Sequence, residues 1–249
     1  MSMRRSSTDK SRRAKTQLAV PPEKQTPLLL PIAALPEDED GAQLLLTRVR
    51  RGLMRGDRRL AAVMKAIGKC GYRRRAGGFP TLFQAILRQQ LSGKAAATIA
   101  QRVHLACGGA ITPEIVASLD DATFAAAGVS RQKRQYLRGL AASALQNPTL
   151  FAELEAVPDE AAIAALTAIK GIGRWTADMY LIFSLGRLDV LPLDDVSIRA
   201  AIAQLYQLRR DAPAAKFEAV AESWRPYRSI ACWYLYAHLD RAREGRAGK

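Results

Sequence analysis

The turn at Gly171-Ile172-Gly173 constrains the fold of this 249-residue chain more than any other feature. Apolar residues recur at helical spacing on both sides of it, over 158–168 and over 173–184. Two glycines that flank one apolar residue allow positive φ angles and a close approach of the backbone. Ile172 can then pack between the two helices while the glycine amides face outward. The sequence therefore predicts two helices joined by a tight hairpin.

Helical patterns extend over nearly the whole chain from about residue 42. Alanine and leucine dominate and runs of β-branched residues are short, which favours helices over strands. Asp57, Ser92 and Ser130, which are residue types suited to helix N-caps, precede three of the apolar patterns. The sequence predicts an all-α fold of about ten helices with short connections.

Residues 1–41 have a different composition, rich in Arg, Ser, Lys and Pro, and they end in an acidic cluster at 37–40. Such a composition predicts a disordered tail. The tail holds seven basic and six acidic residues, so +14 of the formal net charge of +15 lies on residues 42–249. A strongly basic fold favours a polyanionic partner, either nucleic acid or an anionic membrane surface.

The membrane alternative has little support in the sequence. No apolar run approaches the roughly 20 residues that cross a bilayer, and residues 1–15 lack the apolar core of a secretory signal. The three cysteines are far apart and form no CxxC pair, which predicts reduced thiols in a cytosolic protein. The two histidines are too few and too scattered for a metal site.

The glycine hairpin also suggests how nucleic acid is held. The amides of Gly171 and Gly173, together with the N-terminus of the following helix, predict an anion site suited to a phosphate. Such contacts hold DNA without reading its sequence. A glycine pair between helices can also be a simple C-cap and turn, but the basic fold favours phosphate contact.

Five stretches resemble the helix-hairpin-helix DNA glycosylase superfamily, and in particular its 3-methyladenine DNA glycosylase II branch. They are RQQLSGKAA at 88–96, GVSRQK at 128–133 (the weakest match), KGIGRWTAD at 170–178, LPLDD at 191–195 and WRPYRS at 224–229. The last residue of LPLDD follows the second hairpin glycine by 22 positions, the separation expected in the family. The resemblance implies an all-α fold over 42–249, with two helical subdomains, a cleft between them and the hairpin at 166–184.

The resemblance implies that Asp195 is the catalytic residue. Breaking a base–sugar bond builds positive charge on the sugar, and a carboxylate can stabilise that charge and orient a water molecule. Asp194 and Asp195 are both suited to cap the next helix, and we expect Asp194 to cap it and Asp195 to catalyse. Trp175 stands where bifunctional relatives carry a lysine that attacks the sugar. The chain is therefore expected to use water and to leave an abasic site without cutting the strand.

By the same resemblance, Trp175, Met179 and Tyr236 line a pocket for the damaged base. Aromatic rings attract cationic alkylated purines, although Met179 replaces a tyrosine of one relative and each of these side chains could instead pack in the core. The target base must leave the stack, and Gln90 occupies the wedge position that fills the gap. Leu91 is the alternative wedge.

Further residues are expected to touch the DNA or a cation. The DNA-binding set comprises Gln90, Leu91, Ser92, Lys170, Gly171, Gly173 and Arg174. The carbonyls of Thr167, Ile169 and Ile172 match positions that hold a monovalent cation, Na⁺ or K⁺, in the family, and no other cofactor is expected. Residues 48–75 contain eleven Lys or Arg and one acid, Asp57. This run is either a solvated face or a contact to flanking phosphates.

The sequence predicts a monofunctional DNA glycosylase that releases alkylated bases of the 3-methyladenine or 7-methylguanine type in base excision repair. Its expected partner is double-stranded DNA with damaged bases, with no membrane contact, and it is expected to act as a monomer in the bacterial cytoplasm, close to the nucleoid. Two alternatives remain open at this point: a non-catalytic module that binds damaged DNA, and a glycosylase for oxidised or mismatched bases.

Overall fold

The computed structural model describes residues 34–247, and the structural statements below concern these residues. They form thirteen α-helices and one 3-10 helix, and no strand occurs among them apart from a single antiparallel bridge between Ala34 and Arg187. The predicted all-helical fold is confirmed over this part of the chain. None of its helices is both long and apolar enough to cross a membrane.

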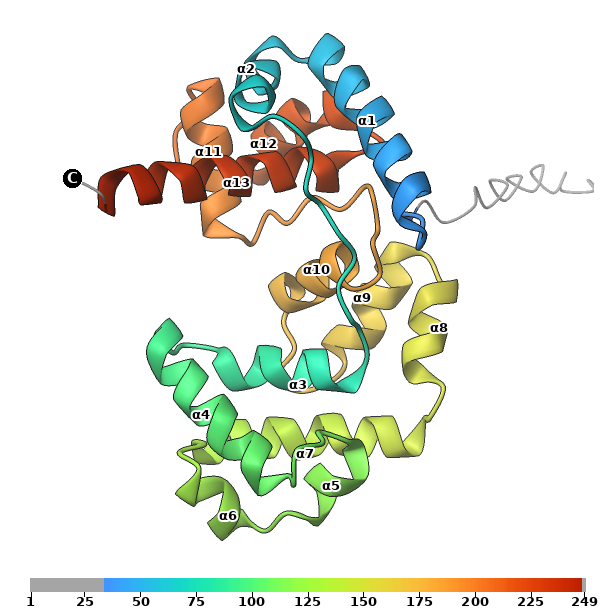
Figure 1. Ribbon diagram of the computed structural model, residues 1–249, viewed down its shortest axis with the longest axis vertical. Helices are drawn as coiled ribbons and strands as arrows, with labels where there is room; N and C mark the ends of the chain where they lie inside the picture. The colour runs from blue at the N-terminus through green and yellow to red at the C-terminus, as the bar shows by residue number, and fades with distance from the viewer. Residues whose placement is uncertain (1–33, 248–249) are drawn as a thin grey trace, which may run out of the picture. The chain divides into compact units, whose positions relative to one another are not determined.

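The helices follow one another with short connections, as Figure 1 shows. In chain order they are α1 Glu39–Gly56, α2 Arg58–Ile67, α3 Phe79–Arg88, α4 Gly93–Ala106, α5 Pro113–Ser118, α6 Asp121–Ala126, α7 Arg131–Gln146, α8 Leu150–Ala156, α9 Asp159–Thr167, α10 Arg174–Phe183, α11 Val196–Tyr206, α12 Ala214–Ala221, the 3-10 helix η1 Glu222–Trp224 and α13 Arg228–Ala247. The short α8 is the one helix of this set that the apolar pattern does not predict.

The packing contacts divide these helices into two groups (Figure 1). One group contains α3 to α10, in which α3 packs on α4 and α7, α9 packs on α8 and α10, and Tyr136 of α7 lies against Gly171 of the hairpin between α9 and α10. The other contains α1, α2, α11, α12, η1 and α13, so the first and last helices of the described chain lie together. The chain therefore crosses between the groups twice, along residues 68–78 and along residues 184–195.

The predicted N-caps are confirmed. The Asp57 carboxylate accepts the amides of Arg59 and Leu60 at 2.9 Å, and the hydroxyl oxygens of Ser92 and Ser130 accept amides at the starts of α4 and α7. These side chains satisfy donors that the first turn of a helix leaves unpaired. Local cap chemistry thus fixes where these three helices begin.

The predicted boundary of the tail at residue 41 is wrong for its last part. Helix α1 already begins at Glu39, because Asp38 accepts the amide of Gly41 at 2.5 Å and caps it. Leu35 is buried, and its amide donates to the carbonyl of Gly186 at 2.8 Å. Residues 34–41 therefore belong to the packed part of the chain, while the predicted disorder of residues 1–33 lies outside the described residues.

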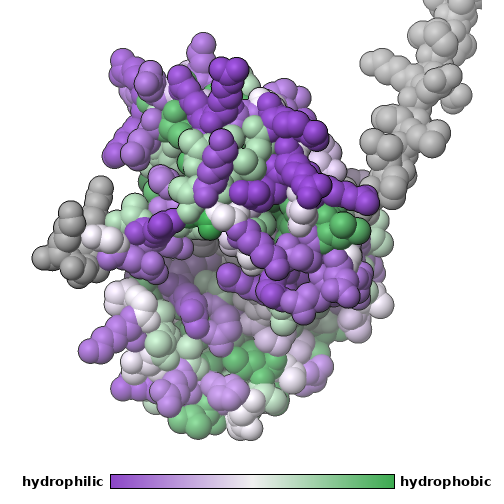
Figure 2. Space-filling model, turned by 45° about the horizontal axis from the view of Figure 1, so that its top comes forward, coloured by the Kyte–Doolittle hydropathy of each residue, from purple (hydrophilic) through white to green (hydrophobic). Residues whose placement is uncertain are grey.

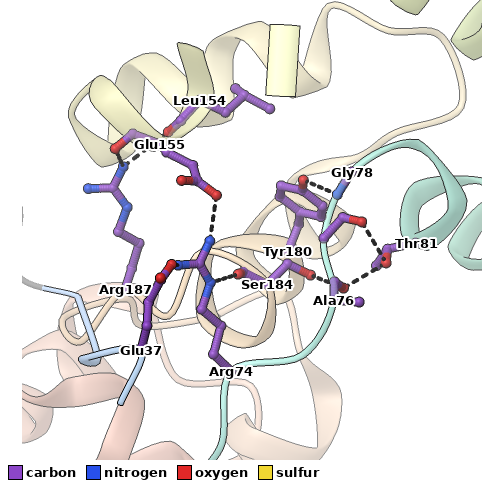
Figure 3. Close-up of polar contacts among 11 residues, drawn as sticks. Glu37, Arg74, Ala76, Gly78, Thr81, Leu154, Glu155, Tyr180, Ser184 and Arg187 are labelled. Carbon is purple, nitrogen blue, oxygen red and sulfur yellow. Dashed lines mark hydrogen bonds and ion pairs between the residues drawn. The ribbon is translucent and has the colours of Figure 1, made fainter. Parts of the chain in front are cut away.

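Hydrogen bonds hold the two crossing segments against the end of α10 (Figure 3). The Tyr180 hydroxyl accepts the amide of Gly78 at 2.7 Å, and the Arg74 guanidinium donates to the carbonyl of Ser184 at 2.7 Å. The buried Arg187 donates to the carbonyls at the end of α8, those of Leu154 and Glu155, each at 3.0 Å. These contacts fix the connections on either side of the candidate site.

The three cysteines are free and buried. Burial raises the pKa of the Cys70 thiol to about 11, which disfavours the reactive thiolate. Burial raises the pKa of the other two thiols as well, so none of the three is a candidate nucleophile.

Candidate active site

The hairpin between α9 and α10 has the predicted form. Ile169 and Ile172 are buried, whereas Lys170 and Gly173 are exposed. Gly171 has a φ angle of +97°, and a Cβ at this position would lie 2.5 Å from the ring of Tyr136. Glycine is therefore required here both by the backbone conformation and by the side chain that packs on it.

The wedge loop, residues 89–92, follows α3 directly and is hydrogen-bonded to the hairpin. The Gln89 side-chain amide donates to the carbonyl of Gly171 at 2.9 Å. The Lys133 ammonium donates to the carbonyls of Leu87 and Gln89 at 2.8 and 2.6 Å, which satisfies the end of α3. The Lys133 ammonium therefore stabilises the loop that carries Gln90.

Gln90 is the more accessible of the two predicted wedge residues. It is exposed with a φ angle of 56°, whereas Leu91 is half-buried. Ser92 caps α4 through its hydroxyl, which accepts the amide of Ala95 at 3.4 Å. The loop therefore presents the Gln90 side chain to solvent beside the hairpin.

Asp195 has two sets of partners. Its Oδ1 accepts the amides of Ser197 and Ile198 at 2.8 and 2.9 Å, so it caps α11, and its Oδ2 accepts the indole N–H of Trp175 at 2.7 Å. The expectation that Asp194 provides the cap is wrong, because Asp194 is exposed and Asp195 makes the capping bonds. A carboxylate has two oxygens, so one residue can cap the helix and still present an oxygen to the site.

The fold brings Trp175 and Met179, two of the three residues predicted to line the base pocket, to one cavity, which Tyr236 does not border. This cavity of about 590 Å³ is bordered by Gln90, Trp175 and Met179. Trp175 is 44% exposed, which argues against a pure core role for this aromatic residue. The Tyr236 hydroxyl from α13 lies 3.7 Å from the sulfur of Met179. Burial and the neighbouring Asp195 raise the pKa of Tyr236, so its phenol stays protonated.

Several residues of this cavity are absent from the predicted site set, and two of them matter for its chemistry. Phe183 from α10 and Arg75 from the 68–78 segment also border it. The Arg75 guanidinium lies over the Phe183 ring at 4.9 Å. Arg75 belongs to the basic run whose role the sequence leaves open, and only the path of the chain between α2 and α3 shows which of its members reaches the cavity.

The arginines of the basic run at residues 48–75 differ in their ion-pair partners. Hydrophilic side chains cover much of the face that Figure 2 turns toward the viewer, which includes α1 and α2. Arg48, Arg51 and Arg55 are exposed on α1, and no carboxylate of the described residues lies within 4.0 Å of them. Arg73 and Arg74, by contrast, form ion pairs with Glu39 and Glu37.

Arg174, predicted to contact DNA, is held by carboxylates within the protein. Its guanidinium pairs with Asp178 and Glu160, each at 3.0 Å. Asp178 is buried, and burial raises its pKa to about 6 despite the neighbouring arginine. Lys170 has no such partner among the described residues, so its ammonium is the freer of the two hairpin cations.

Comparison with known proteins agrees with this geometry. Residues 83–226 match the family described as HhH-GPD superfamily base excision DNA repair protein. The alkylbase DNA glycosidase-like protein mag2 of Schizosaccharomyces pombe is 30% identical over 206 residues, which cover 80% of this chain and 96% of the relative.

Two solved structures are similar as well. The DNA-3-methyladenine glycosidase of Bacillus halodurans superposes with a TM-score of 0.69 at 36% identity, over 79% of this chain and 91% of that one. The 3-methyladenine DNA glycosylase of Schizosaccharomyces pombe, in complex with abasic DNA, gives a TM-score of 0.66 at 33% identity, over 76% and 95%. The chain belongs to the HhH-GPD superfamily of base excision DNA repair proteins.

Proposed function

We propose that this protein is a monofunctional DNA glycosylase that hydrolyses the N-glycosidic bond of alkylated bases in double-stranded DNA. The observation that carries the proposal is the Asp195 carboxylate, fixed by two backbone amides and by the Trp175 indole beside the cavity. The family membership and the names of the similar proteins point to the same activity.

The proposed mechanism follows from the charge that develops on the sugar. As the bond between the base nitrogen and the sugar carbon breaks, its electron pair leaves with the base and the sugar becomes cationic. Asp195, held in place by its three donors, stabilises that cation and orients a water molecule. The water oxygen bonds to the sugar carbon, its proton passes to the Asp195 carboxylate and from there to solvent, and an abasic site remains. Trp175 provides no amine, so no covalent enzyme–sugar adduct forms.

The hairpin and the wedge loop supply the DNA contacts of this proposal. The exposed Gly173 amide, the N-terminus of α10 and the Lys170 ammonium face solvent together, which suits a phosphate. Gln90, exposed on the adjacent loop, fills the space of the everted base. Arg174 contributes indirectly, through its ion pairs at the first turn of α10.

A monovalent cation at the hairpin is compatible with the carbonyls present. The carbonyl oxygens of Thr167 and Ile172 accept no hydrogen bond from the described residues, and that of Ile169 accepts the amide of Ile172 at 3.0 Å. Unpartnered carbonyl oxygens are ligands that Na⁺ and K⁺ take. A bound ion would add positive charge next to the DNA phosphate and would play no part in bond cleavage.

The substrate class within the family is a finer proposal. We assign alkylated purines, and with them the 3-methyladenine DNA glycosylase II branch, because the cavity places Trp175 and Phe183 where rings can stack on a base. Met179 gives the pocket a thioether in place of a further aromatic ring, and its flexibility suits more than one adduct shape.

The test is base release from duplexes that each carry one lesion. We expect Asp195→Asn to slow release by about 10²–10⁴-fold while the affinity for DNA is kept. Asparagine keeps the helix cap, but its NH2 group cannot accept the Trp175 indole N–H, so a small loss of melting temperature is expected. Asp195→Ala also loses the cap and should cost about 1 kcal/mol more. Asp194→Asn, on the exposed neighbour, is the matched control and should behave as wild type.

Four outcomes would contradict the proposal. Full base release by Asp195→Asn would remove the carboxylate from the mechanism. An adduct trapped with borohydride would show a bifunctional enzyme and an amine nucleophile elsewhere. Binding of damaged duplexes without release of any base would leave only the non-catalytic alternative, and release confined to oxidised or mismatched bases would reassign the substrate.

A further inference from the structure

Arg75 lies at the cavity with its charge unpartnered. Its backbone amide donates to the carbonyl of Phe183 at 2.7 Å, which fixes the chain beside α10. Its guanidinium then lies over the Phe183 ring, 4.9 Å from the ring centre, and borders the same cavity as Trp175 and Met179. The arginine is thus anchored by its backbone, and its side chain, although the residue is exposed, stacks on the Phe183 ring.

The three consecutive arginines of this segment have different partners. Arg73 pairs with Glu39, and Arg74 pairs with Glu37 and with the carbonyl of Ser184. Arg75 makes no side-chain hydrogen bond and no ion pair with any residue between 34 and 247. Stacking uses only the face of a guanidinium, so the N–H donors at its rim are available to a ligand in the cavity.

The positive charge of Arg75 at the cavity affects which bases the cavity accepts. A base with an oxygen or an unsubstituted ring nitrogen can accept a charge-assisted hydrogen bond from the guanidinium. A base made cationic by alkylation is repelled by the same group, and alkylation of a ring nitrogen also removes an acceptor. The charge therefore opposes the attraction that the aromatic rings exert on cationic purines.

We infer that Arg75 is a specificity-determining residue that extends base release from cationic alkylated bases to neutral damaged bases with a free acceptor. The inference rests on the proposed glycosylase function and goes beyond its alkylated substrates. Hypoxanthine, which is neutral and has free O6 and N7 acceptors, represents the class whose release depends on Arg75. 7-Methylguanine, which is cationic and has its N7 blocked, represents the alkylated class whose release does not.

The test compares single-turnover release of these two bases by the full-length protein. We expect Arg75→Gln to slow hypoxanthine release by about ten- to a hundredfold, the range of a hydrogen bond to a charged group, and to leave 7-methylguanine release unchanged or faster. Arg75→Lys keeps the charge but not the planar guanidinium that stacks on Phe183, so hypoxanthine release should fall less than in Arg75→Gln, while 7-methylguanine release stays as in wild type. Arg73→Gln removes the same charge outside the cavity and should leave both rates as in wild type.

Other results would overturn the inference. An equal loss for both bases in Arg75→Gln, with weaker binding to undamaged duplex, would make Arg75 a phosphate contact. Arg88, which borders the cavity together with Gln90, would then be a further candidate for a phosphate contact. An equal loss with a lower melting temperature would make Arg75 structural, and a wild-type protein that releases only 7-methylguanine would exclude the extension to neutral bases. These results concern Arg75 alone and leave the proposed function standing, because that function is tested by the outcomes given above, among them full base release by Asp195→Asn.

Discussion

Replacing Gln90 by glycine should raise the stability of this protein and lower its activity. Gln90 and Gln207 are the two non-glycine residues between 34 and 247 with a positive φ angle, 56° and 59° respectively. This left-handed conformation brings the Cβ of an L-residue close to the following carbonyl oxygen, whereas glycine has no such contact. At the wedge loop, the surrounding hydrogen bonds from Gln89 and Lys133 keep the chain in this conformation.

The expected gain follows from two opposing terms. A left-handed L-residue costs about 1–2 kcal/mol, and the extra backbone freedom of glycine in the unfolded chain costs about 0.5–1 kcal/mol. Gln90→Gly should therefore raise the free energy of unfolding by about 0.5–1 kcal/mol. For a chain of this size, that corresponds to about 1–4 °C in melting temperature.

The activity should change in the opposite direction. The side chain of Gln90 is the part that fills the DNA stack, and each 1.4 kcal/mol or so of lost compensation for unstacking slows base release about tenfold. Gln90→Ala removes the same side chain without relieving the backbone, so it should be equally slow and no more stable. Gln207→Gly, at the left-handed C-cap of α11, should be stabilised to a similar extent with normal activity.

Thermal melting and single-turnover base release, measured on all three variants, decide the question. If Gln207→Gly is stabilised and Gln90→Gly is not, the conformation of the wedge loop carries no strain. If Gln90→Gly releases bases at the wild-type rate, Gln90 is not the wedge and Leu91 takes its place. A loss of activity in Gln207→Gly would show that backbone relief itself alters the site, and the comparison would no longer isolate the side chain.

Two further predictions concern the groups that hold the hairpin. Because burial raises the pKa of Asp178 to about 6, the folded state binds its proton more tightly than the unfolded state, so this residue makes stability fall as the pH rises from about 4 to about 6. Asp178→Asn should remove that fall, by on the order of 2–3 kcal/mol between pH 4 and pH 7, in urea titrations, while Asp194→Asn should not; an unchanged slope would refute the assignment. Gly171→Ala places a methyl group against the ring of Tyr136 at a left-handed position and should cost about 2–5 kcal/mol in the same titrations, and a loss below about 1 kcal/mol would show that the hairpin adapts.

The sequence predicted those features whose cause is local. The caps at Asp57, Ser92 and Ser130 are visible because the cap residue and the amides that it accepts lie within three positions of each other. The hairpin is visible for the same reason, since the glycine and the buried isoleucine are adjacent. Helix α8, by contrast, has no side-chain cap and only seven residues, which is too short for a clear apolar period.

Features that depend on long-range packing could not be read from the sequence. Asp194 and Asp195 are adjacent, and either could cap α11 by its residue type. Asp195 is the cap in the structure, where its other oxygen accepts the indole N–H of Trp175, twenty residues earlier. In the sequence, nothing local distinguishes Arg75 from the other basic residues of 48–75. Its contact with Phe183 joins residues that are distant in the chain, so only the fold shows it. The residue types were visible in both cases, but their neighbours were set by the fold.

The hydrogen bond between Trp175 and Asp195 has a consequence for how the site is assembled. Trp175 lies in the first turn of α10 in one group of helices, and Asp195 caps α11 in the other, so this bond of 2.7 Å joins the two groups. The contact of Tyr236 with Met179 joins them a second time. A change in the angle between the groups would therefore move the carboxylate relative to the cavity before it disrupted either core. The hydrogen bonds that fasten the crossing segments to α10 oppose such a change, and they keep the carboxylate preorganised beside the base.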